Sequence, residues 1–290
     1  MKPIERILVI ADKPKHDPLA LKRGFELMRA LGAKLHITAY AYHVMYNHKS
    51  VFGKQERRAV RDELVGERMD WLGSQVAALG GGKDVTFETR WTPDIAQNVN
   101  ELVREGKYGL VLKSAHRART LTHTPTDWDL LRGCPAPVLL TVEPWPDRIK
   151  VLAALDLNSE DKPHRKLNLK VMAIANEIAK GCKGEVHAVY AIELPRIVSM
   201  LDAEKAEKKA RDLAAGLLGE LLSPYDVPGT RVHLEAGKVG AVVNGVAARI
   251  GANLLVLGTT ARKGLSGLVI GNSAERVLAK AQCDVLALKP

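Results

Sequence analysis

The sequence has few aromatic residues, few cysteines and no long apolar run, and each shortage argues against a class of protein. Phe, Trp and Tyr make up 4% of the 290 residues, too few for the stacking surfaces that bind single-stranded nucleic acids. No uninterrupted apolar run approaches the roughly 18 residues of a transmembrane helix. Three scattered cysteines are too few for a disulfide framework or a zinc cluster. We therefore expect a cytoplasmic protein with no place in a membrane.

Motifs of common catalytic and metal-binding sites are also missing. The chain has no P-loop, no Gly-x-Gly-x-x-Gly after its first predicted strand and no Gly-x-Ser-x-Gly elbow. It has neither a His-Glu-x-x-His nor a Cys-x-x-Cys metal pair. The start, "MKPIERILVIAD", does not read as a signal peptide, because Glu5 and Arg6 interrupt it and Asp12 ends its apolar run. We expect no dedicated enzyme, and any ATP hydrolysis would be slow and incidental.

What the sequence does contain is a globular composition with an excess of positive charge. Hydrophobic residues make up 46% and charged residues 26% of the chain, and the formal net charge is +10. The excess is spread along the chain without a basic tail or block, so nucleic acid is not the expected partner. Spread in this way, the charge favours solubility and the attraction of small anions.

The chain contains an internal duplication. A short apolar strand ending in an aspartate opens each half: Asp12 follows "RILVIA" and Asp156 follows "KVLAAL". A second apolar strand recurs later, as "YGLVLKS" and "NLLVLGT", and a cysteine, Cys134 or Cys283, precedes the last strand of each half. The landmarks keep one order and nearly one spacing. The sequence therefore predicts two tandem copies of one domain.

Within each copy, strand patterns alternate with helix patterns. The strands are uniformly apolar, as in parallel sheets that helices cover on both faces. This alternation predicts an α/β fold of two tandem doubly wound domains, each with a five-stranded parallel sheet flanked by helices. Two prolines followed by charges in "EPWPDRIK" place the domain boundary, with one domain at residues 1–147 and the other at 148–290. Ligands bind such sheets beyond the carboxyl ends of the strands.

A candidate anion site follows the fourth predicted strand of the second half. Asn272 is a favoured N-cap residue, and Glu275 three positions later completes a capping box. Gly271 before them allows a tight turn and leaves the backbone clear for a phosphate. Asp156 ends the first strand at the same edge of the sheet, where its carboxylate can accept hydrogen bonds from an adenine amino group or a ribose hydroxyl. A capped helix start without a ligand, and an aspartate that only caps a turn, would leave the same residues.

At these residues the chain resembles the universal stress protein family, over nearly its whole length and in two copies. The family pattern is an aspartate after the first strand, then Gly-x-x-Gly, nine residues and Gly-Ser or Gly-Thr after the fourth. The segment "LLVLGTTARKGLSGLVIGNSAERVLAKAQCDVLALKP" carries most of the likeness. The resemblance implies strand order 3-2-1-4-5 in each domain and an intrachain pseudo-dimer in which the fifth strands meet. In some members it also implies an ATP site.

Carried onto this sequence, the implied nucleotide site lies in the second domain. Its residues follow strands 1, 2 and 4 and begin the last helix: Leu155, Asp156, Ala191, Leu257, Gly258, Ala261, Gly271, Asn272 and Ser273. Ala261 replaces the second glycine of the motif, and its methyl would stand where a phosphate approaches. Asn272 replaces the Ser or Thr of the motif, although Ser273 follows. The ligand is then ATP, another adenine nucleotide such as ADP or AMP, or another small anion.

The first domain departs further from the motif. Its connection, "KSAHRARTLTHTPTDWDLL", contains no glycine, so we expect Asp12 to be a relic and this domain to bind no nucleotide. Thr126 and Asp129 still suit a helix cap. The segment 42–55, with His43 and His48, suits an ordinary surface loop, a partner contact or a small-molecule lid.

Two functions stay open from the sequence, with an enzyme of another class on the same fold as a third. In the first, the protein is a stress-response sensor whose bound nucleotide biases contacts with an unidentified protein partner. In the second, it is a structural or interaction protein that acts through its pseudo-dimer surface and has a vestigial cleft. Whether two chains associate into a homodimer is also open.

Overall fold

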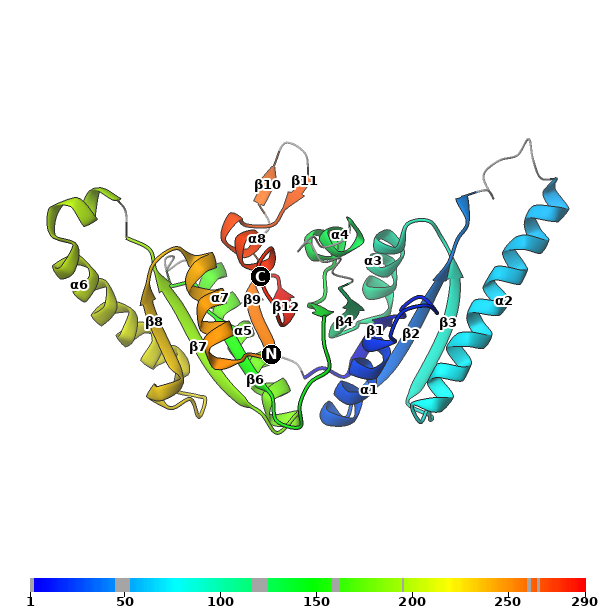
Figure 1. Cartoon of the computed structure of the whole chain (residues 1–290), viewed down its shortest axis with the longest axis horizontal. Coiled ribbons are helices and arrows are strands. Elements are labelled where there is room, and N and C mark those ends of the chain that lie inside the picture. The colour runs from blue at the N-terminus through cyan, green and yellow to red at the C-terminus, as the bar shows by residue number, and fades with distance from the viewer. Residues whose placement is uncertain are drawn as a thin grey trace. The chain divides into compact units, whose positions relative to one another are not determined.

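The chain forms two compact α/β units, which we describe from a computed structural model (Figure 1). The structure describes residues 3–44, 53–115, 125–157, 162–194, 196–259, 262–264 and 267–290. Of these, residues 4–115 and 125–141 belong to one unit, and the residues from 142 onward belong to the other. Strands and helices alternate along both units, which confirms the predicted fold class.

In the first unit, five parallel strands run in the order β3-β2-β1-β4-β5. The strands are β1 (Arg6–Ile10), β2 (Lys34–Ala41), β3 (Val85–Trp91), β4 (Leu110–Ser114) and β5 (Val138–Thr141). The helices are α1 (Leu19–Leu31), α2 (Lys54–Ala78), α3 (Ile95–Gly106) and α4 (Pro125–Gly133). The sheet therefore grows outward from β1 in one direction and then from β4 in the other, which makes the carboxyl ends of β1 and β4 the topological switch point.

The second unit repeats this topology, with five parallel strands in the order β8-β7-β6-β9-β12. The strands are β6 (Lys150–Ala154), β7 (Glu185–Ile192), β8 (Val232–Ala236), β9 (Leu254–Gly258) and β12 (Asp284–Leu288). The helices are α5 (Lys162–Gly181), α6 (Arg196–Leu222), α7 (Val239–Ile250) and α8 (Asn272–Leu278), with a short 3-10 turn at Gly229–Arg231. The order 3-2-1-4-5 is thus confirmed in both units.

The connection between β9 and α8 contains an element that the sequence does not predict. β10 (Arg262–Gly264) and β11 (Gly267–Val269) form a short antiparallel ribbon inside it (Figure 1). Ala261 lies outside the described residues. Ile270 and Gly271 follow β11 and lead directly into α8.

The central strands are buried because helices cover both faces of each sheet. The side chains of Ile7, Leu8 and Val9 in β1 are 0% exposed, and so are those of Leu254 and Leu255 in β9. In the second unit, α5 and α7 lie on opposite faces of the sheet (Figure 1). The helices thereby leave only the ends of the strands open to a ligand.

Two further predictions concern the whole chain. Cys134 and Cys283, which precede β5 and β12, are buried, and the three cysteines form no disulfide in the described structure. Across the described ranges, we find no helix with the length and hydrophobicity of a membrane-spanning segment.

Candidate functional site

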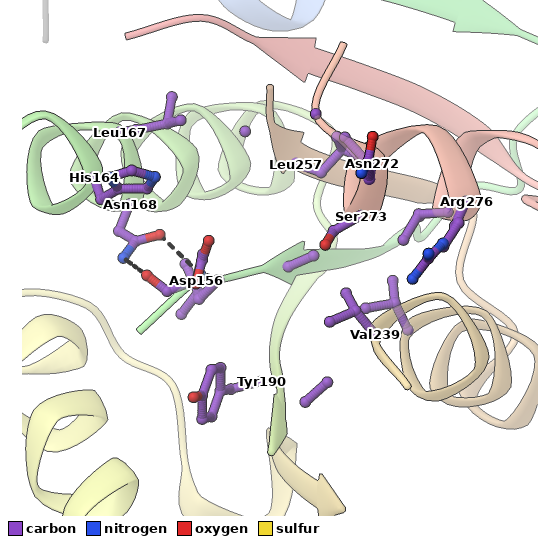
Figure 2. Close-up of a pocket in the computed structure, with 18 of the residues that line it drawn as sticks. Asp156, His164, Leu167, Asn168, Tyr190, Val239, Leu257, Asn272, Ser273 and Arg276 are labelled. Atoms are coloured by element: carbon purple, nitrogen blue, oxygen red, sulfur yellow. Dashed lines mark hydrogen bonds between the residues drawn. The ribbon is translucent and has the colours of Figure 1, made fainter. Parts of the chain in front are cut away.

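A cavity of about 380 Å³ lies at the carboxyl ends of β6, β7 and β9 in the second unit (Figure 2). This is the switch point of the sheet, where β6 and β9 are neighbours but are joined by a long crossover through β7 and β8. Helices α5, α7 and α8 supply the remaining walls. Small-molecule sites in proteins commonly have this size and this position.

The cavity brings together the residues that the sequence predicts for a nucleotide site. All but one of the nine line it, namely Leu155, Asp156, Ala191, Leu257, Gly258, Gly271, Asn272 and Ser273. The ninth, Ala261, is not among the described residues. Because these residues come from three strand ends and one helix, their meeting depends on the parallel order of the sheet.

Asp156 is held at the mouth of the cavity through its backbone. Nδ2 of Asn168 on α5 donates to the carbonyl oxygen of Asp156 at 2.7 Å, and Oδ1 of Asn168 accepts from the Asp156 amide at 3.1 Å (Figure 2). The side chain of Asp156 is exposed and lines the cavity. Burial raises the pKa of the nearby Tyr190, and the charge of Asp156 raises it further. The Tyr190 hydroxyl is therefore neutral at physiological pH and is able to donate a hydrogen bond.

Gly258, at the end of β9, is required by the close approach of α5. A Cβ at this position would lie 2.5 Å from Cδ2 of Leu167, well inside van der Waals contact. Any side chain at residue 258 would therefore force the side chain of Leu167 to move, on the helix that also carries Asn168.

The start of α8 differs from the predicted capping box. The N-cap residue is Gly271, whose carbonyl oxygen accepts from the Glu275 amide at 3.0 Å, and no side chain caps the helix. Asn272 is instead the first helical residue, so the prediction of Asn272 as the cap is wrong. Gly271 has φ −59° and ψ 140°, which any residue can adopt, so a tight turn is not the reason for a glycine here. The exposed side chains of Asn272 and Ser273 line the cavity instead of capping the helix.

Several residues of the cavity wall were not predicted from the sequence. They are His164, Leu167 and Asn168 on α5, Tyr190 and Glu193 on and after β7, Val239 and Val243 on α7, and Arg276 on α8. Arg276 follows Asn272 by four residues, so helical spacing alone could have placed both on one face. No sequence signal marks Asn168, because its position depends on how α5 packs against β6.

At the matching end of the first sheet, the described side chains contact one another. Asp12 is 4% exposed, and its Oδ2 accepts from the amide of Ala20 and from Oγ of Ser114, both at 3.0 Å. Arg68 on α2 donates to the carbonyl oxygen of Asp12. Ser114 ends β4 as Gly258 ends β9, so the first unit has a hydroxyl at the position where the second unit has no side chain.

A buried ion pair completes this packing. Nζ of Lys113 lies 2.8 Å from Oδ1 of Asp127 on α4 and donates to the carbonyl oxygen of Ser114 at 2.9 Å. Asp127 is 0% exposed. Lys113 stands in β4 where Leu257 stands in β9. Among the described residues of the first unit, these side chains thus form a polar network at the strand ends that match the cavity of the second unit.

Other predictions for the first unit concern a helix cap, the segment 42–55 and metal binding. Thr126 and Asp129 lie within α4, and Oδ1 of Asp129 is 4.0 Å from Nη1 of Arg132, but the residues before Pro125 are outside the described ranges, so the cap stays a prediction. His48 and most of the segment 42–55 lie outside the described residues. In the part of the chain that the structure describes, no three His, Cys, Asp or Glu residues are placed to hold a metal ion.

Comparisons with known proteins match the whole length of the chain. A model described as "Universal stress protein family" matches residues 3–141 and 150–289. Universal stress protein E of Escherichia coli K12 is 31% identical over an aligned length of 301 residues. The alignment covers 99% of this chain and 94% of that protein. The universal stress protein E homolog of Haemophilus influenzae is 26% identical over 303 residues, covering 99% and 97%.

Solved structures agree with the fold. A functionally unknown protein from Pseudomonas aeruginosa PAO1 is 28% identical with a TM-score of 0.75, and the match covers 99% of this chain and 93% of that one. A universal stress protein from Archaeoglobus fulgidus has a TM-score of 0.65 at 15% identity, covering 98% of each chain, and this likeness concerns the fold alone.

Proposed function

The chain is a member of the universal stress protein family, and on this premise we propose that its second domain is a sensor that binds an adenine nucleotide or a similar small anion. The ligand lies between Asp156 and the connection that runs from Gly258 to Ser273. Its occupancy biases contacts with a protein partner during the stress response. The observation that carries the proposal is the cavity, which has Asp156 on one wall and Asn272 and Ser273 on another.

The side chains of the cavity suit the two ends of a nucleotide. The carboxylate of Asp156 accepts hydrogen bonds from a ribose hydroxyl or an adenine amino group, and apolar residues such as Leu155 and Val239 contact the base. The Asn272 amide, the Ser273 hydroxyl and the Arg276 guanidinium are donors for phosphate oxygens. Arginine binds phosphate through paired, charge-assisted hydrogen bonds.

The first domain does not share this role in our proposal. Ser114 and the ion pair of Lys113 with Asp127 occupy the strand ends where the second domain has Gly258 and Leu257. The Asp12 carboxylate already accepts from two protein donors. We therefore expect one ligand for each chain.

Calorimetric titration of the full-length protein with AMP, ADP and ATP tests the proposal. We expect one site, and Asp156→Ala lowers the affinity about tenfold or more because a charge-assisted hydrogen bond is lost. Asp226→Ala is the matched control, since Asp226 is an exposed aspartate of the same domain outside the cavity. Absence of binding for all three nucleotides, or equal effects of the two variants, would contradict the proposal and favour a structural or interaction protein.

A further inference from the structure

A histidine occupies the same strand position in both domains. His36 is the third residue of β2, and His187 is the third residue of β7. Both strands are the second of their domain and lie beside the outermost strand of the sheet, β3 or β8. The partners of the two histidines differ.

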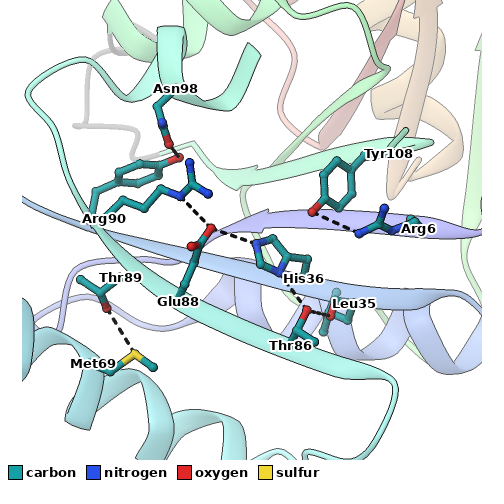
Figure 3. A network of polar contacts seen from close by, with 11 residues as sticks. Arg6, Leu35, His36, Met69, Thr86, Glu88, Thr89, Arg90, Asn98 and Tyr108 are labelled. Atoms are coloured by element: carbon teal, nitrogen blue, oxygen red, sulfur yellow. Dashed lines mark hydrogen bonds and ion pairs between the residues drawn. The ribbon is translucent and has the colours of Figure 1, made fainter. Parts of the chain in front are cut away.

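In the first domain, both ring nitrogens of His36 face groups that can accept a hydrogen bond (Figure 3). Nδ1 lies 2.8 Å from Oγ1 of Thr86, and Nε2 lies 3.1 Å from Oε1 of Glu88. The Thr86 hydroxyl can donate its own proton to the carbonyl oxygen of Leu35, at 3.5 Å. A doubly protonated His36 therefore keeps both contacts.

The carboxylate that faces His36 stays ionised in acid. Burial by itself raises the pKa of Glu88, but hydrogen bonds from Arg90 and His36 outweigh it and hold that pKa below its ordinary value. Glu88 consequently stays ionised when the pH falls into the range where histidine titrates. Tyr108, which Arg6 contacts, stacks on the His36 ring at a centroid distance of 5.9 Å (Figure 3).

In the second domain, His187 faces another histidine. Nδ1 of His187 lies 3.1 Å from Nε2 of His233 on β8, and the two rings are stacked with their planes 13° apart. Nε2 of His187 lies 3.1 Å from Oε1 of Glu185. An ionised carboxylate only accepts, so Nε2 of His187 carries a hydrogen.

Only one hydrogen can lie between the two facing nitrogens, Nδ1 of His187 and Nε2 of His233. If His187 is neutral, its Nδ1 accepts from His233, and if His187 is protonated, His233 must accept. When both rings are cations, each facing nitrogen carries a hydrogen and the hydrogen bond is lost. The hydrogen bond between the rings therefore tolerates one added proton but not two.

Charged groups of both signs surround the pair, and their effect is resolved for His233. Arg231 pairs with Glu185 at 2.7 Å, and Lys150 on β6 also acts on that carboxylate. Arg249 on α7 pairs with Glu235 on β8. Burial is the main cause that lowers the pKa of His233, followed by His187 and Arg249, while Glu235 opposes them.

We propose that His187 and His233 form an acid-sensitive latch between β7 and β8, which the first domain lacks at the same position. Acidification protonates both rings, breaks their hydrogen bond and loosens the outer edge of the second sheet, while β2 and β3 stay joined. The pKa of folded His233 lies below the value of 6.5 that applies when the chain is unfolded, so the unfolded state takes up the proton first. The stabilisation is therefore complete above about pH 6.5 and is lost as the pH falls through the lower folded value.

The latch and the cavity share strand β7. β7 carries His187 and also Tyr190 and Ala191 of the cavity wall, and α7 carries both Arg249 and Val239. Acid would thus act on the same elements that shape the candidate site. The proposal does not depend on which ligand that site binds.

Hydrogen exchange of the full-length protein at pH 7.5 and pH 5.0, followed by mass spectrometry and corrected for intrinsic rates, tests the latch. We expect protection of peptides over β7 and β8 to fall about tenfold at the lower pH, because a hydrogen bond between the two strands is lost. Peptides over β2 and β3 should change much less. In His233→Gln, the amide can either donate to His187 or accept from it, so the acid effect should disappear. His36→Gln is the control and should leave the response of the second domain unchanged.

Equal loss of protection at the edges of both sheets, or an undiminished acid response in His233→Gln, would overturn the proposal. An NMR titration of the ring protons in the unmodified protein gives a second measurement that needs no variant. Two separated steps for His187 and His233, the second of them below pH 6.5, support the latch. Independent titration of both rings as ordinary histidines would refute it.

Discussion

The side chain of Asn168 forms two hydrogen bonds with the backbone of Asp156. Its Nδ2 donates to the carbonyl oxygen of Asp156 at 2.7 Å, and its Oδ1 accepts from the Asp156 amide at 3.1 Å. Asn168 is buried, with 7% of its surface exposed, whereas Asp156 is exposed. One side chain on α5 thus positions the carboxylate at the end of β6. A binding residue and its support lie only twelve positions apart, on two different elements.

Removing this support should disturb the site without removing the carboxylate. Asn168→Ala loses two hydrogen bonds, each worth about 1 kcal/mol, and frees the backbone of Asp156. We expect nucleotide affinity to fall about tenfold in calorimetric titration, together with a loss of stability in urea denaturation.

Asn253→Ala is the matched control for that variant. Oδ1 of Asn253 accepts from the Lys150 amide at 2.9 Å, at the opposite end of the same strand β6. The control should lose stability and keep its affinity. Equal affinities in the two variants would show that Asn168 does not position Asp156 for binding.

Gly258 should not tolerate even one added methyl group. Gly258→Ala places a Cβ against Leu167, and overpacking of this kind costs about 1–3 kcal/mol in the free energy of unfolding. Urea denaturation of the single variant and of the double variant Gly258→Ala, Leu167→Ala measures the coupling between the two sites. Removal of the Leu167 side chain should recover part of the loss, and an additive double variant would rule out the clash as its cause.

We expect the loss of one partner of the Lys113–Asp127 ion pair to destabilise the first domain, and the replacement of both partners to destabilise it much less. Lys113→Met leaves a buried carboxylate without its cation, at a cost of about 3–5 kcal/mol. The double variant Lys113→Met, Asp127→Leu should recover most of this loss. Tryptophan fluorescence in urea is a suitable measurement, because three of the four tryptophans, Trp71, Trp91 and Trp128, lie in the first unit.

Arg276 should distinguish phosphorylated ligands from bare nucleosides. Arg276→Ala removes a guanidinium from the cavity wall, so we expect the affinity for ADP to fall about tenfold while any binding of adenosine changes little. Lys280→Ala is the control, since Lys280 is an exposed cation just beyond α8 and outside this cavity. A similar loss for adenosine would show that Arg276 acts on the fold or the base and not on phosphate.

Much of the fold could be read from local patterns. Apolar strands such as "RILVI" and "LLVLG" predict buried parallel strands, because helices must cover both faces, and their recurrence reveals the duplication. The start of α8 could not be placed to the residue. A backbone carbonyl, that of Gly271, begins the helix where a side chain of Asn272 was expected to cap it.

The sequence by itself determined the strand and helix alternation, the two copies and the candidate residues around Asp156, Gly258 and Ser273, since each depends on periodicity or on local motif chemistry. Only the tertiary structure showed which side chains meet at each sheet end. Ser114 contacts Asp12 and Lys113 contacts Asp127 at one end, whereas Leu257 and Gly258 line a cavity at the other. The partners of His36 and His187 were decided in the same way, because strand register and not proximity in the chain brings Glu88 or His233 to the ring.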